Sequence, residues 1–242
     1  MSLDIHINDD AIFIADSHIQ KNRDALIYKL NNLDSIRQKI PSQIVFLGDI
    51  SNLLVGKIRS SEIINEKLIE CIKNLKSQII YFEGNHDFNI KSVLDSPNMI
   101  IPRDIQPVIA HYKNKIIMLA HGDIFLDQKY EFYINTITSK KMISFLGCLD
   151  FVSKGKIFNI INNKVKAKEI KYPRNADSII NQRISAYKNY IKSLDIKVDM
   201  VIEGHFHIGK IINDKDFIYV AMPSFYHDAK IFDIQNKKFE TI

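Results

Sequence analysis

Cysteine and long apolar runs are scarce in this sequence of 242 residues. Its two cysteines, Cys71 and Cys148, form no paired motif, which excludes a disulfide framework and predicts reduced thiols in a cytosolic protein. The longest apolar stretches fall well short of the roughly 20 residues that a membrane-spanning helix needs. Residues 1–10 show no basic region followed by an apolar run, so we predict no signal peptide.

Repeats, low-complexity segments and linkers rich in proline or glycine are also missing. We therefore predict one domain over residues 1–242. The hydrophobic fraction of 46% and the charged fraction of 25% are those of an ordinary globular protein. The formal net charge of +5 suits an anionic partner, but it does not distinguish a nucleotide from a nucleic acid or a membrane surface.

Five short apolar runs each end abruptly in a polar cluster. The runs cover residues 11–15, 44–47, 79–82, 116–120 and 200–202, and two further runs cover 217–221 and 230–234. Runs this short and continuously apolar predict strands buried on both faces. The polar clusters that follow are Asp16-Ser17-His18, Gly48-Asp49, Glu83-Gly84-Asn85-His86-Asp87, His121-Gly122-Asp123 and Glu203-Gly204-His205-Phe206-His207.

Helical patterns separate several of these strands. Apolar residues recur at helical spacing over residues 21–33, over 60–75 with Ser60 or Ser61 as the cap, and over about 175–194. Alternating strands and helices predict a largely parallel core with right-handed crossovers. Ligands of such sheets bind beyond the carboxyl ends of the strands, which is where all five polar clusters fall.

A basic helical insertion over about residues 126–172 interrupts the alternation. Residues 140–171 hold eight lysines against two acidic residues, a net charge of +6, beside an apolar stripe at helical spacing. This pattern favours two interpretations equally: a lid or interfacial helix over a lipid, or a helical hairpin that buries its apolar face on the core. Under the first, the residues predicted to contact substrate are Lys140, Lys141, Phe145, Leu149, Phe158 and, near the C-terminus, His227.

The polar clusters supply a set of candidate metal ligands. Imidazole, carboxylate and amide oxygen together suit borderline divalent ions such as Mn²⁺, Fe²⁺, Zn²⁺ or Co²⁺. Two pairs of these residues are separated by a single residue, so on an extended strand end both side chains point the same way. Seven ligands are too many for one ion and suit two ions that share a bridging carboxylate. They are Asp16, His18, Asp49, Asn85, His121, His205 and His207.

The order of the motifs resembles that of the calcineurin-like metallophosphoesterase family. The fragments D-x-H, G-D, G-N-H-D, H-G-D and G-H-x-H occur in this order between residues 16 and 207, each after a predicted strand. The resemblance implies an α/β fold, an α+β four-layer sandwich in which two mixed β-sheets are flanked by helices. It also implies an enzyme, a metal-dependent phosphoester hydrolase.

The resemblance further implies roles for individual residues. Asp16, His18 and His207 hold one metal, Asn85, His121 and His205 hold the second, and Asp49 bridges them. Two ions of this kind, with Mn²⁺ expected, activate water and clamp the phosphate oxygens. His86 assists catalysis beside Asp49, and Asp87 and Asp123 orient neighbouring groups from behind the ligands.

One branch of the family is closest in pattern, the UDP-2,3-diacylglucosamine pyrophosphohydrolases of lipid A synthesis. The similar length, the long insertion after His121-Gly122-Asp123 with Asp127 and Tyr130 early in it, and the late segment 220–227 carry this resemblance. It implies hydrolysis of the nucleotide-linked lipid to UMP and the lipid monophosphate, in the cytoplasm and peripherally on the inner membrane face. His86 stands where that branch carries arginine and matches the wider family instead.

Two alternatives stay open. The first is a soluble phosphodiesterase or nucleotidase of the same family. The second is a non-catalytic scaffold that uses the fold for protein or membrane contact. Nucleic acid is not expected as a partner, and the sequence predicts neither the oligomeric state nor the native metal.

Overall fold

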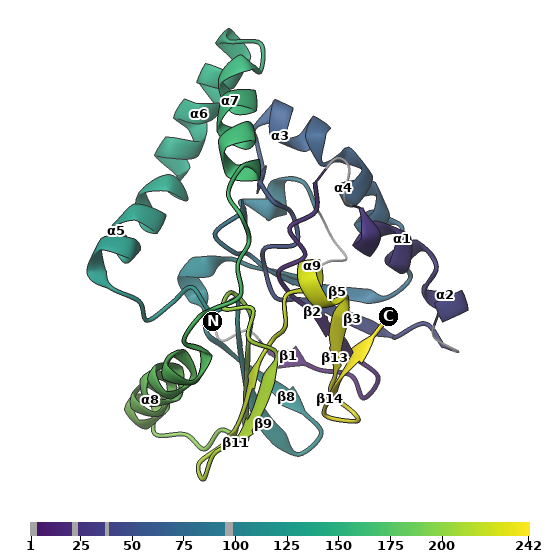
Figure 1. The fold of residues 1–242 in the computed structure, drawn as a ribbon, viewed down its shortest axis with the longest axis vertical. Helices are drawn as coiled ribbons and strands as arrows, with labels where there is room; N and C mark the ends of the chain where they lie inside the picture. The colour runs from purple at the N-terminus through teal and green to yellow at the C-terminus, as the bar shows by residue number, and fades with distance from the viewer. Residues whose placement is uncertain (1–3, 21–23, 37–38, 95–98) are drawn as a thin grey trace.

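The computed structural model describes residues 4–20, 24–36, 39–94 and 99–242 and contains two six-stranded sheets with helices around them (Figure 1). The strands of one sheet follow the order β14-β13-β2-β3-β5-β7, those of the other β1-β8-β9-β10-β12-β11, and β4 and β6 form a separate ribbon. The strands are β1 Ile5–His6, β2 Ile12–Ile14, β3 Gln43–Phe46, β4 Leu54–Val55, β5 Gln78–Phe82, β6 Asp87–Phe88, β7 Met99–Ile101, β8 Val108–Tyr112, β9 Lys115–Ala120, β10 Met200–Glu203, β11 Lys210–Asn213, β12 Ile218–Ala221, β13 Lys230–Asp233 and β14 Lys238–Thr241.

Helices cover the outer face of each sheet. The helices are α1 Ala25–Asn31, α2 Leu33–Ile36, α3 Arg59–Ile64, α4 Glu66–Lys73, α5 Gln128–Ile137, α6 Lys140–Val152, α7 Lys156–Lys166, α8 Ala176–Leu194 and α9 Phe225–Asp228. α1 and α4 pack on the β2-β3-β5 sheet, and α8 packs on the β9-β10-β12 sheet. The layers are therefore helix, sheet, sheet and helix, which confirms the expected two-sheet sandwich.

Successive side chains of each strand point to opposite faces of its sheet and so belong to different layers of the core. Ile12 and Ile14 of β2 face α1 and α4, whereas Phe13 between them faces the second sheet. Between the sheets, Phe13 meets residues such as Leu119 and Ile202 from β9 and β10. The predicted strands all form, and β2, β3, β5 and β7 run parallel, as do β9, β10 and β12.

The predicted helix over residues 60–75 is wrong at its centre and at its cap. The chain forms α3 and α4 with a break at Asn65, because its side-chain amide donates to the Ser61 carbonyl (2.8 Å) and to the Leu53 carbonyl (2.9 Å). α3 begins at Arg59 without a side-chain cap of its own. The Asp150 carboxylate from α6 accepts from the Ser60 amide instead (3.0 Å). The helix predicted over 21–33 is observed as α1 and the start of α2, and its first three residues lie outside the described residues.

The predicted insertion contains α5, α6 and α7, which rise above the two sheets in Figure 1. Ile143 of α6 and Phe158 of α7 pack against Val55, Ile58 and Phe88 near the β4–β6 ribbon. Other apolar residues of these helices remain exposed, so the insertion both packs on the core and offers a free surface. Among the described helices, none is long and apolar enough to cross a membrane.

Candidate metal centre

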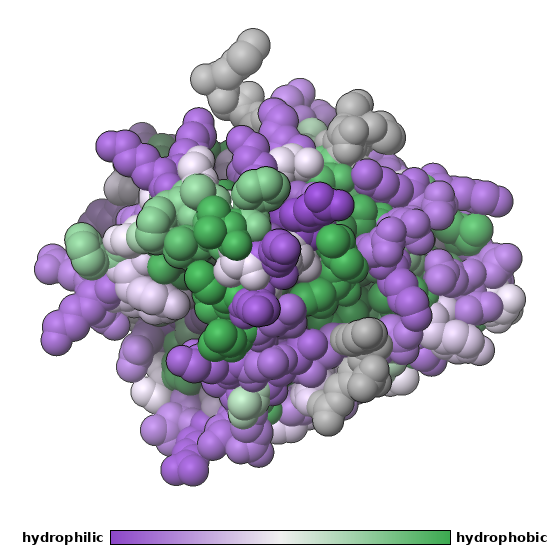
Figure 2. All heavy atoms as spheres, turned by 90° about the horizontal axis from the view of Figure 1, so that it is seen from above, coloured by the Kyte–Doolittle hydropathy of each residue, from purple (hydrophilic) through white to green (hydrophobic). Residues whose placement is uncertain are grey.

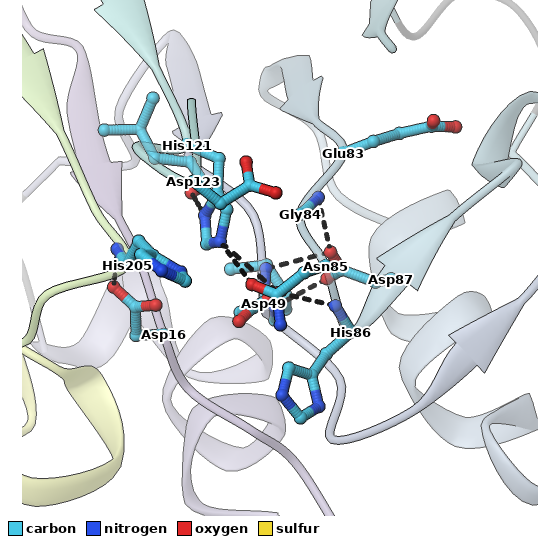
Figure 3. A network of polar contacts seen from close by, with 12 residues as sticks. Asp16, Asp49, Glu83, Gly84, Asn85, His86, Asp87, His121, Asp123 and His205 are labelled. Carbon is cyan, nitrogen blue, oxygen red and sulfur yellow. Dashed lines mark hydrogen bonds and ion pairs between the residues drawn. The ribbon is translucent and has the colours of Figure 1, made fainter. Parts of the chain in front are cut away.

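Five loops bring the predicted ligands together where the two sheets meet. Three loops follow β2, β3 and β5 of one sheet, and two follow β9 and β10 of the other (Figure 3). Backbone bonds join the loops directly: the Asp16 amide donates to the Gly48 carbonyl (3.1 Å), and the His18 amide donates to the Asp49 carbonyl (3.0 Å). The site is therefore shaped by contacts between segments far apart in the sequence.

Five of the seven predicted ligands have a left-handed backbone. Their φ angles are 53° for Asp16, 43° for His18, 53° for Asp49, 68° for His205 and 54° for His207. The expectation that Asp16 and His18 lie on an extended strand end is wrong, because β2 ends at Ile14 and the chain turns there. Such a backbone costs of order 1–3 kcal/mol per residue and gathers at functional sites.

The first group consists of Asp16, His18 and His207. The Nε2 atom of His207 lies 3.4 Å from Asp16 Oδ1 and 3.4 Å from His18 Nε2. Asp16 is fully buried, and its Oδ1 has no hydrogen-bond partner among the described residues. Two imidazole nitrogens and an unpartnered carboxylate oxygen converging in this way fit a divalent cation.

The second group consists of Asp49, His121 and His205, whose ligand atoms all lie within 4.8 Å of one another. The His121 Nε2 atom lies 3.5 Å from Asp49 Oδ1 and 3.3 Å from the amide oxygen of Asn85. The Leu47 carbonyl accepts from His121 Nδ1 (2.7 Å), so the lone pair of neutral His121 is on Nε2. This donor set also fits a divalent cation. A carboxylate oxygen of Asp49 also lies within 4.8 Å of a ring nitrogen of His18 in the first group, so Asp49 is near both groups.

Burial and charge act differently on the four ligand imidazoles. Burial lowers the pKa of His18 and of His205 to about 4, so both are neutral near pH 7. Burial opposes the charged form of His121 and His207 as well, but the adjacent Asp49 and Asp16 carboxylates raise the pKa of these two, so a metal ion would displace their protons. Burial alone would raise the pKa of Asp49, but the neighbouring His121 and His86 hold it well below its usual value. Neutral imidazoles and ionised carboxylates are the forms that bind metals.

His86 and Asp87 occupy different positions around the centre. His86 donates from Nδ1 to the Asn52 carbonyl (2.7 Å), and a ring nitrogen of His86 lies within 4.8 Å of ligand atoms of His18 and Asp49. Asp87 is fully buried behind the ligands and accepts from the Asp49 amide (2.8 Å). It also accepts from the Tyr81 hydroxyl (2.5 Å). His86 thus faces the centre, whereas Asp87 holds the Asp49 loop.

Two buried arginines, absent from the sequence prediction, support the loops that carry His121 and His205. Arg183 of α8 pairs with Glu203 through Nε (2.9 Å) and Nη2 (2.8 Å), and donates from Nη1 to the Ile124 carbonyl (2.6 Å). Arg103 donates from Nε to Asp123 Oδ2 (2.6 Å) and also contacts Glu131 of α5 (3.0 Å). The predicted supporting residue Asp123 is therefore tied to the insertion. A charged residue on the apolar face of α8 was the available signal for Arg183.

The predicted substrate residues are dispersed. Phe158 of α7 is buried and lines a cavity under the insertion, and the His227 ring centroid lies 6.3 Å from that of His207. In contrast, the described walls of the cavities at the centre do not include Lys140, Lys141, Phe145 or Leu149, because these residues lie elsewhere on α6.

A cavity of about 220 Å³ lies over the metal-ligand groups. Lys168 and Lys171, in the segment that leads from α7 towards α8, line it together with Asn52 and His86. The net charge of the insertion predicted a basic contact, and among the described lysines these two line the cavity, with Glu169 between them. They place positive charge beside the metal-ligand groups.

A family model and several solved structures resemble this chain. The sequence matches the calcineurin-like phosphoesterase family over residues 11–209, and no curated protein matches it significantly. One similar solved structure is a novel archaeal phosphodiesterase, with 14% identity, a TM-score of 0.47, and coverage of 96% of this chain and 98% of the other. A second is a protein of unknown function from Aquifex aeolicus, with 18% identity, a TM-score of 0.42 and coverage of 90% of each chain. A third is Vacuolar Protein Sorting 29 from Cryptosporidium parvum, with 12% identity, a TM-score of 0.39, and coverage of 96% of this chain and 94% of the other.

Replacing Arg183 with methionine is expected to lower the free energy of unfolding by about 3–5 kcal/mol, because Glu203 is left buried without its partner charge. The double variant Arg183→Met with Glu203→Gln is expected to recover part of that loss. Urea unfolding followed by circular dichroism measures both. Equal losses in the single and double variants would contradict a role for the buried charge pair.

Proposed function

Because the chain belongs to the calcineurin-like phosphoesterase family, it is a metal-dependent phosphoester hydrolase, and we propose that it cleaves a phosphodiester or diphosphate with one apolar arm. One observation carries this proposal. An apolar pocket of about 500 Å³ under the insertion shares Asn85 and His86 with the wall of the metal centre. A phosphate at the centre thus has an apolar cavity directly beside it.

The residues present fit two divalent ions. Asp16, His18 and His207 would hold one, Asn85, His121 and His205 the other, and Asp49 both. When bound, such ions lower the pKa of water and neutralise charge on the phosphate. The orphaned Asp16 Oδ1 supports the first position, and the tautomer of His121 supports the second.

The protein side chains around this centre have separate tasks. His86, fixed through Nδ1 by the Asn52 carbonyl, presents Nε2 to exchange a proton with the attacking water or the leaving oxygen. Lys168 and Lys171 attract and orient the anionic phosphate. In the reaction, water supplies the hydroxyl on phosphorus, the phosphorus–oxygen bond to the leaving group breaks, and that oxygen takes up the proton.

Helices α5 to α7 form most of the apolar pocket. Its walls include Tyr130 and Tyr133 of α5, Leu146 of α6, and Ile157 and Ile161 of α7. Lys168 stands at the junction, since it lines both this pocket and the metal centre. An acyl chain in the pocket therefore places the attached phosphate beside a positive charge.

UDP-2,3-diacylglucosamine is the specific substrate that we propose, cleaved by water to UMP and the lipid monophosphate. Its apolar acyl chains and its diphosphate suit the pocket and the centre respectively. A soluble phosphodiester or nucleotide is the second candidate, which the small volume of the cavity over the ligands favours.

A membrane contact accompanies the lipid proposal. Figure 2 views the molecule from above the insertion and shows exposed hydrophobic side chains among hydrophilic ones. Phe145, Phe151 and Val152 of α6 are exposed, Phe151 to 80%, and Lys140 and Lys141 begin the same helix. This combination suits an anionic lipid surface, since apolar side chains enter it and lysines meet its charge.

The metal assignment predicts two Mn²⁺ ions per chain in calorimetric titration, and hydrolysis of bis(p-nitrophenyl) phosphate by the loaded protein. His86→Ala is expected to keep both ions and lower kcat by about 10²–10⁴-fold, because only proton exchange is lost. Asp49→Ala is expected to lose both metal binding and turnover. If His86→Ala also lost an ion, His86 would be a ligand and the assigned role would be wrong.

The apolar pocket predicts that Ile161→Asn raises KM for UDP-2,3-diacylglucosamine in detergent micelles about tenfold, since a polar group in the pocket opposes acyl binding. Hydrolysis of bis(p-nitrophenyl) phosphate should not change. Ile160→Asn, on the neighbouring exposed residue, is the matched control. No turnover of the lipid together with good turnover of simple diesters would leave the soluble candidate.

The surface of α6 predicts flotation of the protein with vesicles that contain anionic phosphatidylglycerol, and not with phosphatidylcholine alone. The variant Lys140→Glu with Lys141→Glu should bind the anionic vesicles at least about thirtyfold more weakly, since each of the two lysines near the surface contributes roughly 1 kcal/mol. The variant Lys197→Glu with Lys215→Glu, distant from the insertion in the sequence, is the charge-matched control. Equal loss in both variants would rule out α6 as the contact.

A further inference from the structure

Helix α7 has two chemically different faces. Ile157, Ile161 and Val165, spaced four residues apart, line the apolar pocket. Asn162 and Lys166, also four residues apart, line a second cavity of about 470 Å³ on another side of the helix. The helix is thus a wall between an apolar and a more polar compartment.

The second cavity lies between α7, α1, and the α3–α4 pair. Ile27 of α1 and Leu68 of α4 contribute apolar walls, and Asn65 stands between α3 and α4. The cavity adjoins the metal centre, because Asn52 lines both. A group bonded to a phosphate at the centre can therefore extend into it.

One buried amide in this wall is orphaned. Asn52 is 3% exposed, and its Nδ2 has no hydrogen-bond partner among the described residues. Buried polar groups of native proteins are nearly always hydrogen-bonded, so this orphaned amide indicates a ligand that completes its bond. Asn162 lines the same cavity and adds a second carboxamide to its wall.

The charges of the cavity distinguish between ligands. Among the described residues of the wall, Asp24 and Glu66 balance Lys67 and Lys166, so these walls offer no excess positive charge for a second phosphate. Carboxamides offer both donors and acceptors, as the edges of nucleobases and the hydroxyl groups of sugars do. Apolar side chains beside them suit the faces of a flat ring.

We propose that this cavity, which we call the α7 polar pocket, binds the neutral, hydrogen-bonding arm of the substrate, a nucleoside or a sugar attached to the scissile phosphate. Asn162 recognises this arm directly, and Asn52 contacts it beside the phosphate. The inference rests on the proposed function, since it assumes a phosphate at the metal centre. The apolar arm of the diester then lies on one side of α7 and the hydrogen-bonding arm on another.

The test is calorimetric binding to the Mn²⁺-loaded protein of three phosphonates that cannot be hydrolysed at their carbon–phosphorus bond. They are methylphosphonate, a nucleoside 5′-methylenephosphonate and a glucose 1-methylenephosphonate. At least one of the last two should bind about tenfold more tightly than methylphosphonate, and the stronger identifies the arm. Asn162→Ala and Asn162→Leu should each weaken that ligand about three- to tenfold, the range for one neutral hydrogen bond, and leave methylphosphonate unchanged.

Asn163→Ala is the matched control, since this neighbouring residue is exposed and does not line the cavity. It should bind all three ligands like the parent protein. Equal affinities for the three phosphonates, or equal effects of Asn163→Ala and Asn162→Ala, would overturn the proposal while leaving the metal site intact. Failure of methylphosphonate itself to bind would instead overturn the proposed function, and the α7 polar pocket with it.

Discussion

The buried carboxylate of Asp87 is the interaction on which the geometry of the centre depends. Its two oxygens accept from the Asp49, Ile50 and Gly84 amides and from the Tyr81 hydroxyl. These bonds join the loop after β3 to the loop after β5 and so fix Asp49 beside Asn85 and His86. Burial and the nearby Asp49 raise the pKa of Asp87 to about 6, so the amide donors stabilise a charge that its surroundings disfavour.

The strained backbone at five ligands is possible because the surroundings compensate for it. Gly48 and Gly84 let the loops approach closely, since a Cβ atom at either would collide with His121 or Asp49. The pair of Arg183 with Glu203 then supports the loop that carries His205 from the opposite side. Rigid sheets on both sides thus hold an arrangement that the loops alone would not adopt.

The sequence predicts the central strands well, because each is a continuous apolar run ended by a polar motif. It misses β1, β4, β6 and β7, which are only two or three residues long, and β8, β11 and β14, which are not continuously buried. It also joins α3 to α4, because the bond of Asn65 to another segment leaves no local pattern. The grouping of the ligands is implied by the resemblance to the family, which rests on motif order. The sequence does not predict the supporting arginines or the lysines at the cavity. The net charge of a segment shows that it is basic, but it does not show which side chains point into the protein.

The hydrogen bond from His121 Nδ1 to the Leu47 carbonyl has a consequence for the choice of metal ion. This bond and the supporting pairs join protein groups to one another, so the packing of the two sheets positions the ligands, whereas a zinc finger depends on its metal to fold. Because the affinity of such a donor set for first-row divalent ions follows a general order, the supply of each metal contributes to which ion the centre would hold.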